Sequence, residues 1–219
     1  MNRRALFALV LALIMGAFPV MAADDAAFLA AARSGDSAAL TRLLAAGQPV
    51  DTRDAERRTA LLLATHADAV DAARVLIEAG ADVNAKDRIE DTPYLYAGAE
   101  GRTEILKLTL SHGANLKDTN RYGGTALIPA AEKGHPENVR LLLEAGVDPN
   151  HVNRLGWTAL LEAVILTDGG PVYQEIVADL IKGGADVNLA DGEGVTPLAH
   201  ARSRGYAEIA KLLEAAGAK

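Results

Sequence analysis

The sequence predicts an all-α solenoid, a stack of helix-turn-helix units joined by hairpin loops, because two kinds of residue recur at one period in the 219-residue chain. Threonine recurs at intervals of 33 residues and finally 38, at Thr59, Thr92, Thr125, Thr158 and Thr196. Glycine follows the same intervals, then one more of 33, at Gly47, Gly80, Gly113, Gly146, Gly184 and Gly217. In both series the interval grows by five residues inside the same unit, which indicates a true repeat with one insertion.

The two ends of the repeat region are predicted to be caps. The first unit keeps two helical segments, Phe28 to Ala32 and Ala39 to Leu44, but lacks a Thr-Pro signal, as expected where an outer face meets water. The last unit stops just after Gly217 without a following hairpin. The sequence therefore predicts about six units, with approximate bounds 24–51, 52–84, 85–117, 118–150, 151–188 and 189–219.

Each internal unit is predicted to begin its first helix at the recurring threonine. Thr92-Pro93 and Thr196-Pro197 place a side-chain oxygen at the N-cap and proline at the first helical position. About nine residues later a glycine ends this helix, at Gly35, Gly101, Gly134 and Gly205. The second helix carries apolar runs such as Val75-Leu76-Ile77 and stops at the glycine of the 33-residue series.

The segment that follows each second helix has turn chemistry. Gly80-Ala81-Asp82-Val83-Asn84 is repeated as Gly184-Ala185-Asp186-Val187-Asn188, and its Asp and Asn side chains can bond their own backbone. With these turns and with Asp191 to Leu198, which reads Asp-Gly-Glu-Gly-Val-Thr-Pro-Leu, the chain closely resembles the ankyrin repeat family from Asp24 to Lys219. The resemblance implies helix-turn-helix repeats of 33 residues with hairpin loops, and a function in binding.

The chain departs from the family at one position in each of the last five units. Where the family has histidine after Thr-Pro-Leu, this sequence has Leu62, Leu95, Ile128, Leu161 and Ala199. In the family that histidine forms hydrogen bonds across repeats. We therefore expect apolar packing to hold these positions here.

The segment 1–22 is predicted to be a secretory signal peptide. A basic start, Met1 to Arg4, precedes 16 uncharged residues from Ala5 to Val20, and Val20-Met21-Ala22 offers a cleavage site before Ala23. The alternative is an uncleaved membrane anchor, but the run is shorter than the ~20 residues that span a bilayer and contains Gly16 and Pro19. We expect a periplasmic or secreted protein, residues 23–219, with no membrane insertion after cleavage.

Cysteine and charge constrain location and partners further. The chain contains no cysteine, which excludes a lipoprotein anchor and disulfides, and favours a bacterial envelope origin. Without Arg3 and Arg4 the predicted mature chain has 20 Lys and Arg against 29 Asp and Glu, a net charge of about −9. Nucleic acid and anionic membranes are therefore poor partners. The acidity either keeps the protein soluble or matches a basic partner.

No catalytic, cofactor or metal site is predicted. The five histidines occupy different places in the repeat, and no His-x-x-x-His pair, phosphate-binding Gly-x-x-x-x-Gly-Lys or Gly-x-Ser-x-Gly occurs. Ser203 lies three residues from His200, but a working base also needs an orienting group and an oxyanion site. We expect a protein without enzymatic activity, and rank a hydrolase last.

In this fold the concave side is formed by the hairpin residues before each threonine and by the ends of the first helices. The candidate partner-binding residues on the hairpins are Arg58, Arg88, Ile89, Arg121, Tyr122, Arg154, Leu155 and Trp157. The five-residue insertion, within Thr167 to Gln174, adds Tyr173. Trp, Tyr and Arg dominate binding hot spots. The alternatives are that Tyr122 and Trp157 only cap adjacent hairpins, and that the insertion is a tolerated loop.

The sequence thus predicts a monomeric interaction module that grips one folded protein through its concave face, as an adaptor, an inhibitor or an immunity-type protein. The alternative is a structural or protective envelope factor that supports a periplasmic stress enzyme.

Overall fold

The computed structural model describes residues 20–219 and contains twelve helices over that range, arranged as six pairs. The first helices of the pairs are α1 (Val20–Ser34), α3 (Ala60–His66), α5 (Pro93–Ala99), α7 (Leu127–Glu132), α9 (Ala159–Ile165) and α11 (Pro197–Ser203). The second helices are α2 (Ser37–Ala45), α4 (Val70–Glu78), α6 (Thr103–Ser111), α8 (Pro136–Glu144), α10 (Pro171–Lys182) and α12 (Ala207–Ala215). Within these residues there is no strand, only one isolated bridge between Arg53 and Thr59, so the all-α prediction is confirmed.

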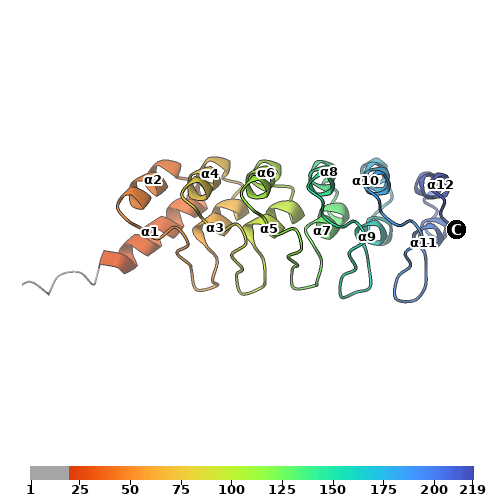
Figure 1. The fold of residues 1–219 in the computed structure, drawn as a ribbon, viewed down its shortest axis with the longest axis horizontal. Helices are drawn as coiled ribbons and strands as arrows, with labels where there is room; N and C mark the ends of the chain where they lie inside the picture. Colours follow the sequence, from red (N-terminus) through yellow and green to blue (C-terminus); the bar gives the residue numbers. More distant parts are fainter. Residues whose placement is uncertain (1–19) are drawn as a thin grey trace, which may run out of the picture.

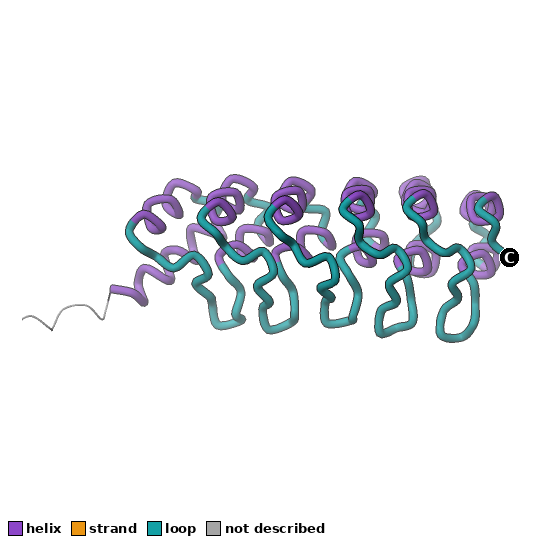
Figure 2. The backbone as a smooth tube through the Cα atoms, viewed as in Figure 1, coloured by secondary structure: helices purple, strands orange, loops and turns teal. Residues whose placement is uncertain are grey.

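The pairs stack into one elongated body with two rows of helices. Figure 1 shows the second helices in an upper row and the first helices beneath them. The hairpin loops project below the first helices, one between each pair and the next (Figure 2). The solenoid predicted from the 33-residue period is therefore the observed architecture.

The predicted signal peptide lies almost wholly outside the described residues, which begin at position 20. Helix α1 starts at Val20, so the expected cleavage before Ala23 falls within its first turn. This helix is longer than the segment Phe28 to Ala32 that the apolar pattern indicated.

Four of the five recurring threonines cap a first helix as predicted. The hydroxyls of Thr59, Thr92, Thr158 and Thr196 accept a hydrogen bond from the backbone N–H three residues on, at 3.0 to 3.3 Å. Thr125 is the exception, and the prediction was wrong there. Helix α7 begins two residues later, at Leu127, and the buried Thr125 hydroxyl has no hydrogen-bond partner. The Ile128 N–H, which would donate to this hydroxyl in a cap, donates instead to the Thr125 backbone carbonyl at 3.3 Å.

The apolar core runs through the whole stack. At the position where the family has histidine, Leu62, Leu95, Ile128 and Leu161 are 0–3% exposed, so apolar packing holds these positions as expected. Ala199 is exposed, and there the expectation was wrong. It belongs to the last described helix pair, which no further pair covers.

Backbones approach closely where α5 meets α7. A Cβ at Gly98 would lie 2.8 Å from the Ala126 Cβ, a distance that side chains do not tolerate. From α8, the amide of Asn138 donates to the carbonyls of Ala97 and Gly98 at 3.0 and 3.1 Å. Buried polar groups are stable only when they are paired, and this amide is paired between two units.

Asparagine side chains also link successive units at the ends of the second helices. The Asn84 amide donates to the Gly113 carbonyl at 2.9 Å, and its oxygen accepts from the Asn115 N–H at 2.8 Å. Asn150 and Asn188 form the same two bonds to the next unit. The last residue of the Gly-Ala-Asp-Val-Asn turn therefore also stabilises the stack, because its side chain forms hydrogen bonds to the next unit.

The insertion lengthens a helix as well as a loop. Helix α10 has 12 residues where α8 has 9, and the segment 166–170 before it is two residues longer than the matching segment 133–135. The Tyr206 hydroxyl donates to the Thr167 carbonyl at 2.5 Å, and its ring covers Gly169. The extra residues are thus packed against the following unit and do not form a free loop.

The unequal capping of Thr158 and Thr125 gives a matched test of this account. Thr158→Val removes the bond to the Leu161 N–H and should lower the free energy of unfolding by about 1 to 2 kcal/mol. Thr125→Val replaces a buried hydroxyl that lacks a partner, so stability should stay level or rise. Urea titration followed by circular dichroism measures both; equal losses would contradict the assigned caps.

Candidate protein-interaction surface

Every hairpin is built by one Asp or Asn, five residues before the recurring threonine. Its Oδ1 accepts from the backbone N–H groups two and four residues on, at 2.9 to 3.1 Å, and the residues are Asp54, Asp87, Asn120, Asn153 and Asp191. Its own N–H donates to the carbonyl four residues on, as in Asn153 to Trp157 at 3.0 Å. Such short-range side-chain bonds fix the turn without help from a partner.

Neighbouring hairpins are joined through their backbones. The Arg88 N–H donates to the Glu56 carbonyl at 3.0 Å, and the Arg154 N–H donates to the Tyr122 carbonyl at 2.9 Å. The Arg154 guanidinium adds a bond to the Arg121 carbonyl at 2.7 Å. Backbone bonds therefore join the hairpins in two pairs, and between the pairs the Arg121 guanidinium lies 3.9 Å from the Asp91 carboxylate.

The middle tips of the hairpin row expose large apolar side chains. Ile89, Tyr122 and Leu155 are 49%, 54% and 57% exposed, and each occupies the same place in its own hairpin. The residue before each is an exposed arginine, and these are Arg88, Arg121 and Arg154. The structure therefore brings six of the nine predicted binding residues together on three consecutive hairpins.

The other three predicted residues are differently placed. Arg58 is half-buried and pairs with Asp54 at 2.8 Å inside its own hairpin. Burial alone would raise the Asp54 pKa, but hydrogen bonds from Arg58 outweigh it and hold that pKa below its ordinary value. Trp157 is only partly exposed, although its hairpin position suggested an open side chain. Tyr173 packs against the core beside Gly134, away from the hairpins, because α10 begins before it.

The first helices contribute residues next to the hairpin row. The rings of His66 and Tyr96, from α3 and α5, stack with centroids 4.0 Å apart, and burial lowers the His66 pKa. Glu100 and Lys133 form an ion pair between the ends of α5 and α7. Tyr96 was missed in the sequence because it lies inside an apolar helical run that reads as core.

In two hairpins the turn-forming Asn or Asp side chain also forms a hydrogen bond to the first helix of its own unit. Its partner in each case is the residue four positions after the recurring threonine. The Asn153 amide donates to the buried Glu162 carboxyl at 2.7 Å, and the His200 ring lies 2.7 Å from the Asp191 carboxylate. Burial, with a smaller contribution from Glu132, raises the Glu162 pKa to about 7. No sequence signal distinguished Glu162 from an ordinary exposed helical glutamate.

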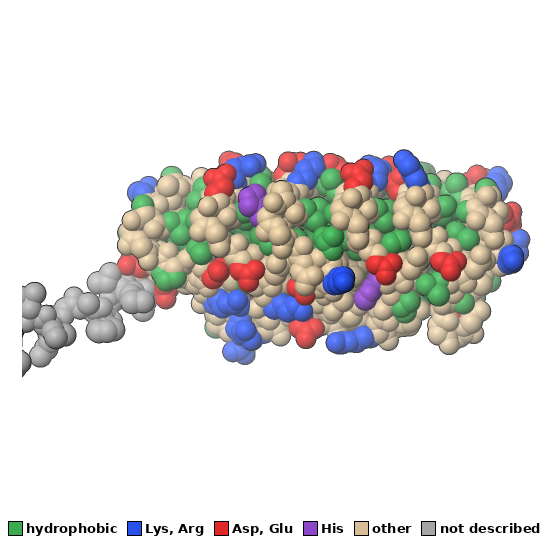
Figure 3. Space-filling model, viewed as in Figure 1, with side chains coloured by type: hydrophobic (Ala, Val, Ile, Leu, Met, Phe, Trp, Pro, Cys, Tyr) green, Lys and Arg blue, Asp and Glu red, His purple; other side chains and the backbone are tan. Residues whose placement is uncertain are grey.

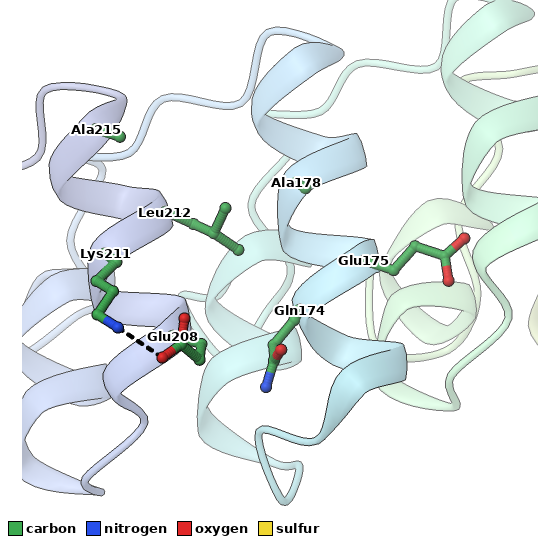
Figure 4. A pocket seen from close by; sticks show the side chains of 7 residues that line it. All are labelled: Gln174, Glu175, Ala178, Glu208, Lys211, Leu212 and Ala215. Carbon is green, nitrogen blue, oxygen red and sulfur yellow. Dashed lines mark hydrogen bonds and ion pairs between the residues drawn. The ribbon is translucent and has the colours of Figure 1, made fainter.

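Elsewhere the surface is only shallowly hollowed. A groove of about 400 Å³ lies between α10 and α12, and Figure 4 shows its lining of Gln174, Glu175, Ala178, Glu208, Lys211, Leu212 and Ala215. Lys211 pairs with Glu208 at 2.7 Å, and Glu175 pairs with Arg140 at 2.7 Å outside the groove. These charges are already matched to each other, so the groove presents no arrangement for catalysis.

Residues 20–219 contain neither a metal-binding cluster nor a membrane-spanning helix. No group of three or more His, Cys, Asp or Glu side chains there could hold a metal ion. Over the same range no helix combines the length and the apolar character that crossing a bilayer requires.

A helical repeat stack with a rigid, laterally exposed row of loops defines a binding scaffold. The model of the family described as ankyrin repeats (3 copies) matches residues 6–87 and 86–153, and the chain belongs to this family. Ankyrin repeat domains mediate protein–protein interaction, and the fold is typically a module without enzymatic activity.

Three known proteins show the likeness in detail. An ankyrin repeat domain from Acinetobacter baumannii AYE is 61% identical, with a TM-score of 0.86 over 88% of this chain and 98% of that one. The ankyrin repeat protein EF0377 is 47% identical, with a TM-score of 0.83 over 86% of this chain and 96% of that one. The ankyrin repeat protein YahD of Escherichia coli K12 is 54% identical over 57 residues, which span 26% of this chain and 28% of YahD.

The raised pKa of Glu162 predicts a pH-dependent stability. The folded state holds the proton more tightly than the unfolded state, so this contribution is full below pH 4.5 and is lost as pH rises through about 7. Glu162→Gln keeps an acceptor for Asn153 without the charge. It should stabilise the protein by about 2 to 3 kcal/mol at pH 8 and change little at pH 4.5.

Thermal unfolding at the two pH values measures this difference. Glu144→Gln, on the exposed side of α8, serves as the control for loss of one surface carboxylate. A melting-temperature gain from Glu162→Gln that is equal at both pH values would contradict the buried, proton-holding carboxyl.

Proposed function

We propose that this chain is an exported, non-enzymatic interaction module of the bacterial periplasm that binds one folded partner protein. Its binding face is the side formed by the hairpin row and the first helices. The role is that of an adaptor, an inhibitor or an immunity-type protein. The module acts as a monomer.

The observation that carries this proposal is the repeated exposure of large apolar side chains at three adjacent tips. Ile89, Tyr122 and Leu155 keep about half of their surface in water, although the stack offers ample apolar core. Exposed apolar side chains that cluster on one rigid surface mark interaction sites in soluble proteins. The backbone bonds described above fix these tips before binding, which reduces the entropy lost on association.

Export is supported by the first 22 residues, which combine a basic start, an uncharged run and a cleavage pattern of small and apolar residues. The lack of cysteine leaves no residue for lipid attachment at the cleavage point. Fractionation of the source bacterium, with detection of the mature N-terminus by mass spectrometry, tests this part separately.

The binding face is tested by capture from the periplasm of the source bacterium. The unchanged chain should capture a partner in a stoichiometric amount. The double variant Tyr122→Ser and Leu155→Ser should capture at least tenfold less of that partner, although its melting temperature equals that of the unchanged chain. Val172→Ser, also an exposed apolar position but at the start of α10, should retain it.

Two results would contradict the proposal. Retention of the partner by the Tyr122 and Leu155 double variant would place binding on another surface. A chain that elutes as a lone monomer from cell extract, with no protein retained by any form, would favour the structural or protective role.

A further inference from the structure

The hairpin tips differ in charge from the rest of the molecule. The whole chain has a formal net charge of −7, yet arginine stands at the same place in three consecutive hairpins, at Arg88, Arg121 and Arg154. The three tips, 88–90, 121–123 and 154–156, contain these arginines and one acidic residue, Glu90. Figure 3 shows basic side chains gathered along the hairpin row in the lower part of the view.

The pattern of an arginine followed by a large apolar residue is confined to the three middle hairpins. In the hairpin before them the matching two residues are Ala55 and Glu56, and in the hairpin after them they are Gly192 and Glu193. Basic residues continue into the first hairpin, where Arg58 pairs with Asp54 and Glu56, and they end before the last hairpin. The three-tip row is therefore a patch of alternating charge and apolar surface.

The guanidinium groups of the row are largely free of internal partners. Neither Arg88 nor Arg154 forms an ion pair within residues 20–219, while the Arg121 guanidinium lies 3.9 Å from the Asp91 carboxylate and 4.9 Å from the centre of the Tyr122 ring. The Arg154 side chain donates only to a backbone carbonyl. Two of the three guanidinium groups thus carry a positive charge that no carboxylate of the described residues pairs with.

Building on the proposed function, we infer that this three-tip row binds a partner protein that presents carboxylates beside apolar side chains. Arginine binds carboxylates through two parallel hydrogen bonds, and the neighbouring Ile89, Tyr122 and Leu155 supply apolar contact area. Because neighbouring helix pairs stack about 10 Å apart, the carboxylates should be spaced about 10 Å as well. An α-helix offers that spacing at every seventh residue, since each residue rises about 1.5 Å.

The acidic net charge supports this choice of partner. An acidic partner would be repelled by most of this surface and attracted only at the tips, so charge would set the orientation of docking. A basic partner would be attracted elsewhere and repelled at the tips. The row therefore selects both the kind of partner and its position.

A library of random 20-residue peptides displayed on phage tests the inference with the full mature chain as bait. Enriched peptides should carry more Asp and Glu than the starting library, together with aromatic or aliphatic residues. The triple variant Arg88→Glu, Arg121→Glu and Arg154→Glu should bind these peptides at least tenfold more weakly. Trp157, the chain's one tryptophan, lies in the third hairpin of the three-tip row, and its fluorescence should change on binding.

A second triple variant controls for net charge. Arg42→Glu, Arg74→Glu and Arg204→Glu reverse three exposed arginines outside the hairpins that form no ion pair within the described range. This variant should bind within twofold of the unchanged chain, with both variants folded by circular dichroism.

Several outcomes would overturn the inference. These are enriched peptides that are basic, equal losses in both triple variants, or no peptide whose binding depends on the three arginines. None of them would overturn the proposed function, which the capture of a partner through Tyr122 and Leu155 decides independently.

Discussion

The structure depends on one constraint, that a pair of short helices can bury its apolar face only against the next pair. First helices of six or seven residues would not persist alone, since isolated helices of this length are marginal in water. Stacking buries α3 from Ala60 to Thr65 and α9 from Ala159 to Val164 almost completely. Each helix is therefore stable because its neighbours are present, and the apolar core extends along the whole stack.

The same constraint leaves the hairpins free for binding. Since the helices carry the core, the loops need only to remain ordered, and a single Asp or Asn orders each of them through two backbone N–H groups. In the later units the other atom of that side chain reaches the first helix, as in Asn153 with Glu162 and Asp191 with His200. These two hairpins are thereby attached to their first helices, while the side chains at their tips stay in water.

The repeat, the helix order and the turns could be predicted because they follow from periodic residues. The exceptions arose where one unit differs from its neighbours in three dimensions. Thr125 has the residue type of a cap, but the Ile128 N–H donates to its carbonyl and not to its hydroxyl, beside the close approach at Gly98. The 33-residue period does not indicate the missing cap at Thr125, because it records residue types and not how closely neighbouring helices pack.

Only part of the candidate site could be predicted from the sequence. The exposed tips at Ile89, Tyr122 and Leu155 followed from their phase in the repeat, whereas the partial burial of Trp157 depends on neighbouring side chains. Tyr173 was expected in a loop but lies in the extended α10, since the insertion lengthened the helix. The buried carboxyl of Glu162 could not be foreseen, because its environment combines Asn153 of its own hairpin with Glu132 of the preceding unit.

Hydrogen exchange of the native protein tests most directly whether the stack orders the tips. The backbone N–H groups of Ile89, Tyr122 and Leu155 lie on exposed loops but donate to the Asp or Asn of their hairpins at 2.9 Å. If the tips are ordered, these amides should exchange slowly, with protection approaching that of the first helices beside them. Exchange at the rate of an unstructured loop would contradict that order.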